Sequence, residues 1–183
     1  DSNRLGGGFE VASTTRLSGR AIGGVRSFRL RRAGDGPKPD DVLEPYAAVD
    51  LTYHFGPRTR LGAAYSRDLQ YSAFTAVSGR PTIRMDTYRV RLDKGLVGAL
   101  DLRLFGGFTK LTSDGPVRVA IGPDDIVTAI RDDEVWEGGA DLGYTFRRHL
   151  RIGVAASYTE RRSTIDDFGI EGLLVGGTIT FTP

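Results

Sequence analysis

Hydrophobic and polar residues alternate along much of the chain. In the clearest stretch, residues 134–146, one parity is largely apolar and the other is largely polar or small. The even positions are Glu134, Trp136, Gly138, Ala140, Leu142, Tyr144 and Phe146. Successive side chains of a β-strand point to opposite faces of its sheet, so this period of two predicts a strand with one apolar face.

The same alternation recurs over much of the chain. It is clear in 46–55, 100–109, 150–161 and 173–181. It is weaker in 17–31, 60–72 and 82–94. Arg67 falls on the apolar parity and Ile22 on the polar one, which β-bulges or strand ends would explain. With a further strand that ends near 9–14, the pattern predicts eight complete strands and at least part of a ninth.

The connections between these strands alternate in length. The short ones are 14–16, 56–59, 95–98 and 147–149. The long ones are 33–44, 74–81, 112–133 and 163–169. Short and long connections are therefore expected on opposite rims. Outer-membrane barrels have short periplasmic turns and long extracellular loops, so the C terminus is expected on the periplasmic side.

Aromatic residues on the apolar parity form two bands. Near the short turns lie Tyr53, Phe55, Tyr144, Phe146 and Phe181, and nearer the long loops lie Tyr71, Phe108, Trp136 and Tyr158. Membrane interfaces favour such bands because an aromatic ring is apolar while its polar edge reaches the headgroups. A soluble core gives no reason for two bands. The apolar face is therefore predicted to face lipid.

Composition narrows the fold further. Lys and Arg number 25 against 23 Asp and Glu, so the net charge of +2 indicates no nucleic-acid partner. The absence of Cys excludes disulfides and thiolate metal sites. No apolar run reaches the roughly 20 residues of a membrane helix. We therefore expect a single domain over 1–183, an all-β, transmembrane, antiparallel up-and-down β-barrel of the bacterial outer membrane.

Five short patterns extend over most of the chain. They are Thr14-Thr15-Arg16-Leu17-Ser18-Gly19, Gly56-Pro57-Arg58-Thr59-Arg60-Leu61, Tyr65-Ser66-Arg67-Asp68, Arg131-Asp132-Asp133-Glu134 and Tyr158-Thr159-Glu160-Arg161-Arg162-Ser163. They resemble the β-barrel porin 2 family of outer-membrane barrels, whose members are often linked to exopolysaccharide secretion. The resemblance implies contact with lipid and lipopolysaccharide, periplasmic export partners and no cofactor. The last strand is similar to the signal read by the barrel-assembly machinery, although Thr182 and Pro183 follow Phe181.

The number of strands leaves two interpretations open. Bacterial single-chain barrels have an even number of strands, whereas nine is odd. Either the chain is the C-terminal part of a larger barrel, or its first segment is a short extension beside a closed eight-stranded barrel. The first interpretation is preferred, because members of the resembled family are larger barrels.

The polar parity carries charges of both signs. Its residues are Arg20, Arg26, Asp50, Asp68, Arg89, Arg91, Asp93, Asp101, Arg103, Glu137, Asp141, Arg151 and Arg161. In a wide barrel they would line a hydrated channel of low charge selectivity, porin-like or serving the export of exopolysaccharide or other polar solutes. In an eight-stranded barrel they would pair and plug the lumen of a structural barrel.

Catalysis and metal binding are the less favoured interpretations. His54 lies four strand positions from Asp50, over about 12 Å, which exceeds hydrogen-bond reach. His149 lies in a tight turn, and no nucleophile pattern accompanies either histidine. A barrel enzyme is therefore the weakest hypothesis. Asp124 and Asp125 could help to hold calcium, but a solvated acidic loop is the preferred interpretation.

Overall fold

The chain forms nine β-strands. The computed structural model describes residues 2–14, 16–28, 42–71, 82–120, 126–146, 149–165 and 168–181. The strands are β1 (Ser2–Thr14), β2 (Leu17–Phe28), β3 (Val42–Gly56), β4 (Thr59–Tyr71), β5 (Thr82–Gly95), β6 (Leu100–Ala120), β7 (Ile126–Phe146), β8 (Leu150–Ser163) and β9 (Ile170–Phe181).

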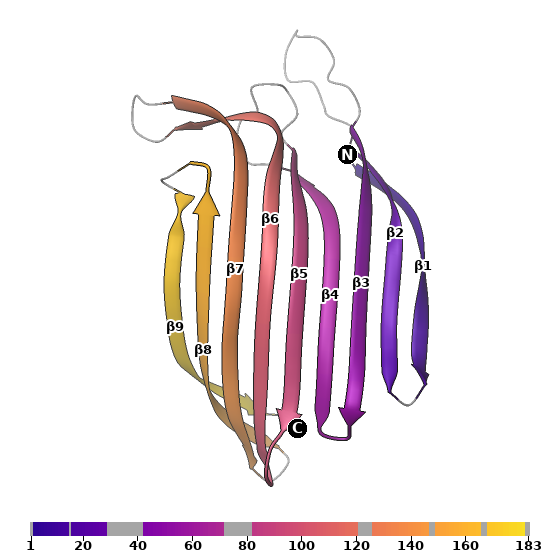
Figure 1. Cartoon of the computed structure of the whole chain (residues 1–183), viewed down its shortest axis with the longest axis vertical. Helices are drawn as coiled ribbons and strands as arrows, with labels where there is room; N and C mark the ends of the chain where they lie inside the picture. Colours follow the sequence, from indigo (N-terminus) through magenta and orange to yellow (C-terminus); the bar gives the residue numbers. More distant parts are fainter. Residues whose placement is uncertain are drawn as a thin grey trace.

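All nine strands belong to one antiparallel sheet in the order of the sequence (Figure 1). The predicted all-β, up-and-down fold is thus confirmed. The tight turns between β3 and β4 and between β5 and β6 lie on one rim, as predicted. Between β5 and β6, Gly98 has a φ of 65°, a left-handed conformation that glycine adopts without a steric penalty.

The predicted long loop over 112–133 is wrong for most of its length. After a register shift between Thr112 and Pro116, the β6–β7 ladder resumes from Pro116 opposite Ile130 to Ala120 opposite Ile126. The sequence predicted a loop here because Ser113, Asp114, Gly115 and Pro116 are typical loop residues. The strand nevertheless continues beyond this irregularity. The strand predicted to end near 9–14 is the complete strand β1, from Ser2 to Thr14.

The two residues of unexpected parity need no bulge. Ile22 lies opposite Ala48, and Arg67 lies opposite Asp86, each within an unbroken register. The register shifts occur elsewhere, between Val11 and Thr14, between Gly56 and His54, and in the β6–β7 hairpin. Ile22 therefore belongs to the polar face and Arg67 to the apolar face.

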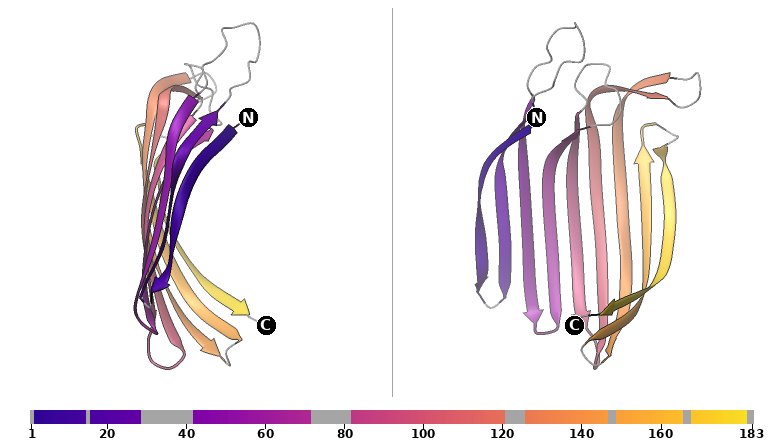
Figure 2. Two further views of the ribbon diagram at one scale, coloured as in Figure 1. Left: turned by 90° about the vertical axis from the view of Figure 1, so that its right-hand side faces the viewer. Right: turned by 180° about the vertical axis from the view of Figure 1, so that it is seen from behind.

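The sheet is an open, curved wall. Seen from the side in Figure 2, it bends along the strands and across them, and β1 and β9 form its two edges. The predicted closure is not found within the described residues. The eight-stranded alternative is wrong for this chain, because β2 pairs with β1 on one side and β3 on the other and so offers no edge to β9.

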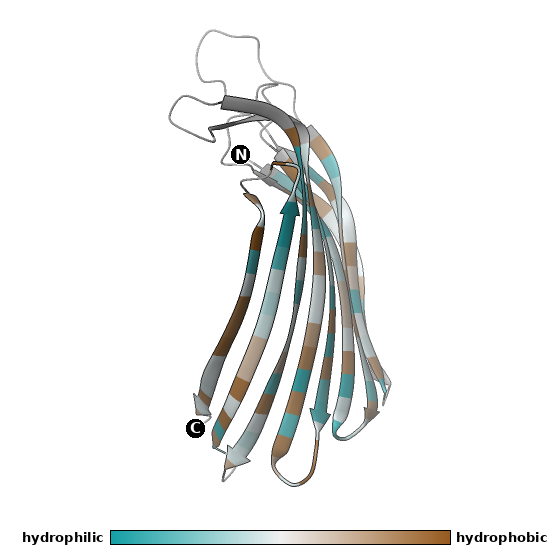
Figure 3. Cartoon of the chain, turned by 60° about the vertical axis from the view of Figure 1, so that its left-hand side comes forward, coloured by the Kyte–Doolittle hydropathy of each residue, from teal (hydrophilic) through white to brown (hydrophobic). Residues whose placement is uncertain are grey.

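The two faces differ in polarity and in curvature. Figure 3 shows apolar and polar bands alternating along the strands. On the charged face, side chains reach past an intervening strand: Arg151 on β8 bonds to Asp101 on β6, and Arg26 on β2 bonds to Asp68 on β4. Arg4 on β1 also bonds to Asp68 on β4, three strands away, at 2.8 Å. Neighbouring strands lie about 4.8 Å apart, so a contact across about 14 Å requires side chains that converge. The charged face is therefore the concave one.

The convex face is apolar and exposed. Val154 is 61% exposed and Ile179 is 77% exposed, and many other large apolar side chains of this face are similarly uncovered. Among the described residues, the buried hydrophobic side chains are those of Leu69 and Ile165. The described part of the fold therefore has almost no apolar core of its own. No helix in the described ranges is long and apolar enough to cross a membrane.

Candidate functional site

The register places every predicted polar-face residue on the concave face. Arg103 on β6, for example, lies between Asp93 on β5 and Asp141 on β7. The residues are Arg20, Arg26, Asp50, Asp68, Arg89, Arg91, Asp93, Asp101, Arg103, Glu137, Asp141, Arg151 and Arg161. Strand periodicity was thus sufficient to identify the face. The lining of a lumen stays a prediction.

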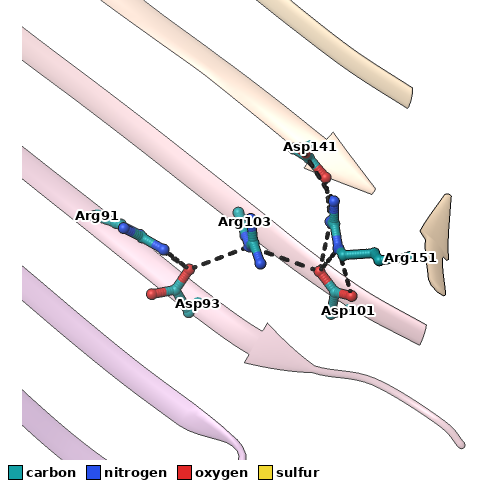
Figure 4. Close-up of polar contacts among 6 residues, drawn as sticks. All are labelled: Arg91, Asp93, Asp101, Arg103, Asp141 and Arg151. Atoms are coloured by element: carbon teal, nitrogen blue, oxygen red, sulfur yellow. Dashed lines mark hydrogen bonds and ion pairs between the residues drawn. The ribbon is translucent and has the colours of Figure 1, made fainter. Parts of the chain in front are cut away.

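Six of these residues form a line of alternating charge across four strands (Figure 4). In order, this charge ladder comprises Arg91, Asp93, Arg103, Asp101, Arg151 and Asp141.

The bonds of the charge ladder are unequal. Arg91 Nη2 lies 2.9 Å from Asp93 Oδ1, and Arg151 Nη2 lies 2.6 Å from Asp101 Oδ1. Arg103 Nε, by contrast, is 3.8 Å from an oxygen of both Asp93 and Asp101, which is beyond hydrogen-bond distance. Arg103 therefore keeps donors available to another acceptor.

Two glycines allow Arg151 to join the ladder. A Cβ at Gly143 on β7 would overlap the guanidinium of Arg151, and one at Gly153 would come within 3.2 Å of its Nη1. The guanidinium can therefore lie flat across β7 and reach Asp101 on β6. The Arg151 side chain is only 10% exposed, so the carboxylates of Asp101 and Asp141 supply the hydrogen bonds that water would otherwise give.

The other charges of the concave face pair in smaller groups. Asp68 on β4 accepts hydrogen bonds from Arg4 on β1, at 2.8 Å, and from Arg26 on β2, at 3.1 Å. Arg20 and Asp50 are 3.4 Å apart, and Arg89 and Glu137 are 3.5 Å apart. All these pairs connect neighbouring parts of one wall. The face therefore keeps a polar surface of mixed sign.

A buried charge cluster lies on the long-loop side of Trp136. Asp133 is 1% exposed and accepts hydrogen bonds from Arg131, Arg161 and Ser163. Burial alone would raise the pKa of Asp133, but these hydrogen bonds together outweigh it and hold the pKa below its ordinary value. The guanidinium of Arg131 also lies 4.5 Å from the ring centroid of Phe168. The cluster thus ties β7 and β8 to the connection before β9.

The predicted interface aromatics all lie on the convex face. They are Tyr53, Phe55, Phe108, Trp136, Tyr144, Phe146, Tyr158 and Phe181. The structure extends the band nearer the long loops into a row of adjacent rings on β4 to β7. Its members in order are Tyr65, Tyr88, Phe108 and Trp136, with ring centroids 4.9, 6.2 and 4.4 Å apart.

A row of charges follows immediately beyond these aromatic rings. On successive strands the convex face carries Arg67, Asp86, Lys110, Glu134 and Arg162, each opposite the next. Their signs alternate, and Arg67 Nε lies 2.7 Å from Asp86 Oδ1. The apolar surface therefore ends at a defined level, with aromatic rings before a line of charge.

Sequence reasoning missed several contributors to these features. Tyr65 and Tyr88 were not assigned to a band, although each shares the apolar parity of its strand. Arg60 was not assigned to the polar face, although it alternates with Leu61. Asp133 and Arg131 were assigned to a loop. Strand parity would have found the first three, whereas the cross-strand register was needed to align the rings.

The catalytic and metal interpretations gain nothing from the described geometry. His54 faces the concave side next to Arg60. His149 lies in the turn before β8, where its backbone N–H donates to the backbone carbonyl of Phe146. In the described ranges no group of three His, Cys, Asp or Glu side chains is placed to hold a metal ion. Asp124 and Asp125, the calcium candidates, lie outside the described residues.

Comparison with known proteins finds no family model that matches the sequence and no curated protein that matches it.

Proposed function

We propose that the chain is the greater part of a wall of an outer-membrane β-barrel, with its convex face in lipid and its concave face lining a hydrated conduit for polar solutes. The observation that carries the proposal is the polarity of the two faces. A soluble barrel encloses apolar side chains and exposes polar ones. Here the concave face is charged and the convex face is apolar.

The convex surface fits a bilayer in height and in boundaries. On β7, its apolar side chains extend from Trp136 to Phe146, a stretch close to the roughly 9–11 residues of a tilted membrane strand. Aromatic rings lie at both ends of the stretch, and charges follow on the long-loop side. An uncovered apolar surface of this extent is unfavourable in water.

The curvature supports a wide lumen rather than a plugged one. Nine strands leave the edges β1 and β9 unpaired with each other, so a barrel of this curvature contains more than nine strands. Barrel diameter grows with strand number. The ion pairs run sideways along the wall, as expected for charges that line a passage. A plugged structural barrel is the alternative.

Planar-bilayer recording of the full-length protein tests the proposal. We expect stable conductance steps with little preference between K⁺ and Cl⁻, because the charge ladder contributes equal numbers of positive and negative side chains. Export of exopolysaccharide, implied by the resemblance to β-barrel porin 2, is the finer proposal and would give larger, polymer-blocked steps. A membrane-inserted protein without conductance would favour the plugged barrel.

A further inference from the structure

We propose that a hollow at the short-turn rim of the concave face binds an anionic group, a phosphate or a carboxylate, carried by a polar solute. This inference deepens the proposed function by naming the class of solute, and it rests on that function for the solute's passage through the conduit.

The hollow has the size of a small-ligand site. It occupies about 580 Å³ beside the turns that join β3 to β4 and β5 to β6. Sites for small molecules commonly measure about 300–1,000 Å³. Concave-face side chains that line it are His54, Arg60, Asp93, Asp101, Arg103, Thr145 and Arg151. Its polar lining suits a charged ligand rather than an apolar one.

Two arginines of the hollow have unused hydrogen-bonding capacity. Arg60 lies opposite Asp93, and Asp93 lies opposite Arg103, so one strand separates the two arginines. Strands two apart are about 10 Å from each other, which two long side chains can span on a concave face. Within the described residues Arg60 has no ion-pair partner. In the described part of the chain, Arg103 has only the two 3.8 Å approaches to carboxylates.

The carboxylates of the hollow are already occupied by other arginines. Asp93 accepts hydrogen bonds of 3.0 and 2.9 Å from Arg91, and Asp101 accepts bonds from Arg151. Their negative charge is therefore compensated without Arg60 or Arg103. An incoming anion meets two guanidinium groups, whose planar donors match phosphate and carboxylate oxygens.

Arg58, in the turn between β3 and β4, adds positive charge at the mouth. Arg58 donates to the carbonyl of Leu96 at 3.2 Å, which holds its side chain over the β5–β6 turn. With Arg58, the side chains that face the hollow include four cations and two carboxylates. The local excess of positive charge favours an anion although the whole chain is nearly neutral.

Isothermal titration of the full-length protein in detergent, at low salt, tests the hollow. The probes are inorganic phosphate, glucuronate and glucose. Glucuronate carries a carboxylate where glucose has a neutral hydroxymethyl group. We expect saturable binding of phosphate and glucuronate and none of glucose. The anion that binds more tightly shows whether the hollow prefers a phosphate or a carboxylate. Tighter binding of either one supports an anion site.

Three variants locate the binding. Arg60→Gln and Arg103→Gln should each weaken anion binding about tenfold, the effect of losing one charge-assisted hydrogen bond. Arg60→Lys should recover part of the affinity because it keeps the charge. The matched control is Arg89→Gln, which removes an exposed arginine of β5 on the concave face but outside this hollow. It should change the affinity less than twofold, far less than the tenfold loss expected at the hollow.

The contrary outcomes are distinct from failure of the conduit. Equal binding of glucose, no saturable binding of either anion, or equal losses in Arg60→Gln and Arg89→Gln would overturn the anion site. The same preparation is recorded in planar bilayers. Anion binding without conductance would keep the hollow and overturn the conduit, whereas conductance without anion binding would do the reverse.

Discussion

Small side chains control where charges can lie on the concave face. Arg151 crosses β7 to Asp101 because Gly143 leaves the space that its guanidinium occupies. Strand periodicity predicted that Arg151, Asp101 and Asp141 share a face, but not that Arg151 bonds to both carboxylates. That contact depends on the absence of a Cβ on the intervening strand, which becomes interpretable only when the register is known.

Gly143→Ala should weaken the sheet by about 1–3 kcal/mol, the cost of leaving a mostly buried polar group without its partner. The new Cβ would push the Arg151 guanidinium away from Asp101. Urea unfolding in lipid vesicles measures the loss through the fluorescence of Trp136, the single tryptophan of this chain. Gly138→Ala on the same strand is the control, because its nearest contact would be 3.7 Å, an ordinary van der Waals distance. Equal losses would contradict the role of Gly143.

Leu142→Arg should impair folding into vesicles far more than Asp141→Asn, although the positions are adjacent. Leu142 is near the middle of the convex stretch from Trp136 to Phe146, where an arginine costs roughly 2–4 kcal/mol at the bilayer midplane. Asp141 is on the concave face, and its partner Arg151 keeps Asp101 after the substitution. Asp141→Asn should therefore alter ion preference rather than folding.

Refolding yield in vesicles measures the first effect, and bilayer currents measure the second. Equal yields for the two variants, or a greater loss for Asp141→Asn, would mean that the faces are oriented oppositely to lipid and water.

At the scale of strands, the sequence predicted where most elements lie but not how far each extends. Alternation located all nine strands because each presents one apolar and one polar face. It failed at β6 and β7 beyond Thr112, where Pro116 and its neighbours have loop propensities and cross-strand pairing overrides them. It also could not interpret Arg67, whose place on the apolar face depends on Asp86 of the next strand.

Single engineered cysteines should reveal the orientation of the two rims in intact cells. The chain contains no Cys, so each introduced thiol is unique within it. Gly169→Cys lies in the β8–β9 connection and Val97→Cys in the exposed β5–β6 turn. A maleimide attached to a large polyethylene glycol should label Gly169→Cys alone, because long loops face outward in such barrels. Lysed cells, in which both should react, are the control. Selective labelling of Val97→Cys would invert the topology.

At the scale of the whole molecule, the directions of the edge strands restrict how the sheet can close. In an antiparallel order of nine strands, β1 and β9 run in the same direction. All-antiparallel closure therefore needs an odd number of further strands between them. Closure by a second copy of this chain does not meet this requirement. A copy in the same orientation would place its β1 parallel to β9 of the first copy, and an inverted copy would place long loops on both rims. We therefore expect an even total above nine strands in the complete barrel, as in single-chain bacterial barrels.

The same restriction predicts how the full-length protein behaves in detergent. Once the edges of the sheet are paired, every backbone N–H and C=O within the apolar zone is hydrogen-bonded inside the barrel. Mild detergent offers no alternative hydrogen-bond partners and therefore does not separate the strands. The exposed convex side chains, such as Leu142 and Val154, require an apolar partner that water does not supply. We therefore expect the protein to partition into detergent and, without boiling, to migrate on gels as a compact species that heating converts to an extended one. Leu142→Arg should reduce the compact fraction, which ties the behaviour to the convex face. A monodisperse native protein in detergent-free buffer would contradict the membrane assignment, because the apolar convex face would then have to be covered by protein.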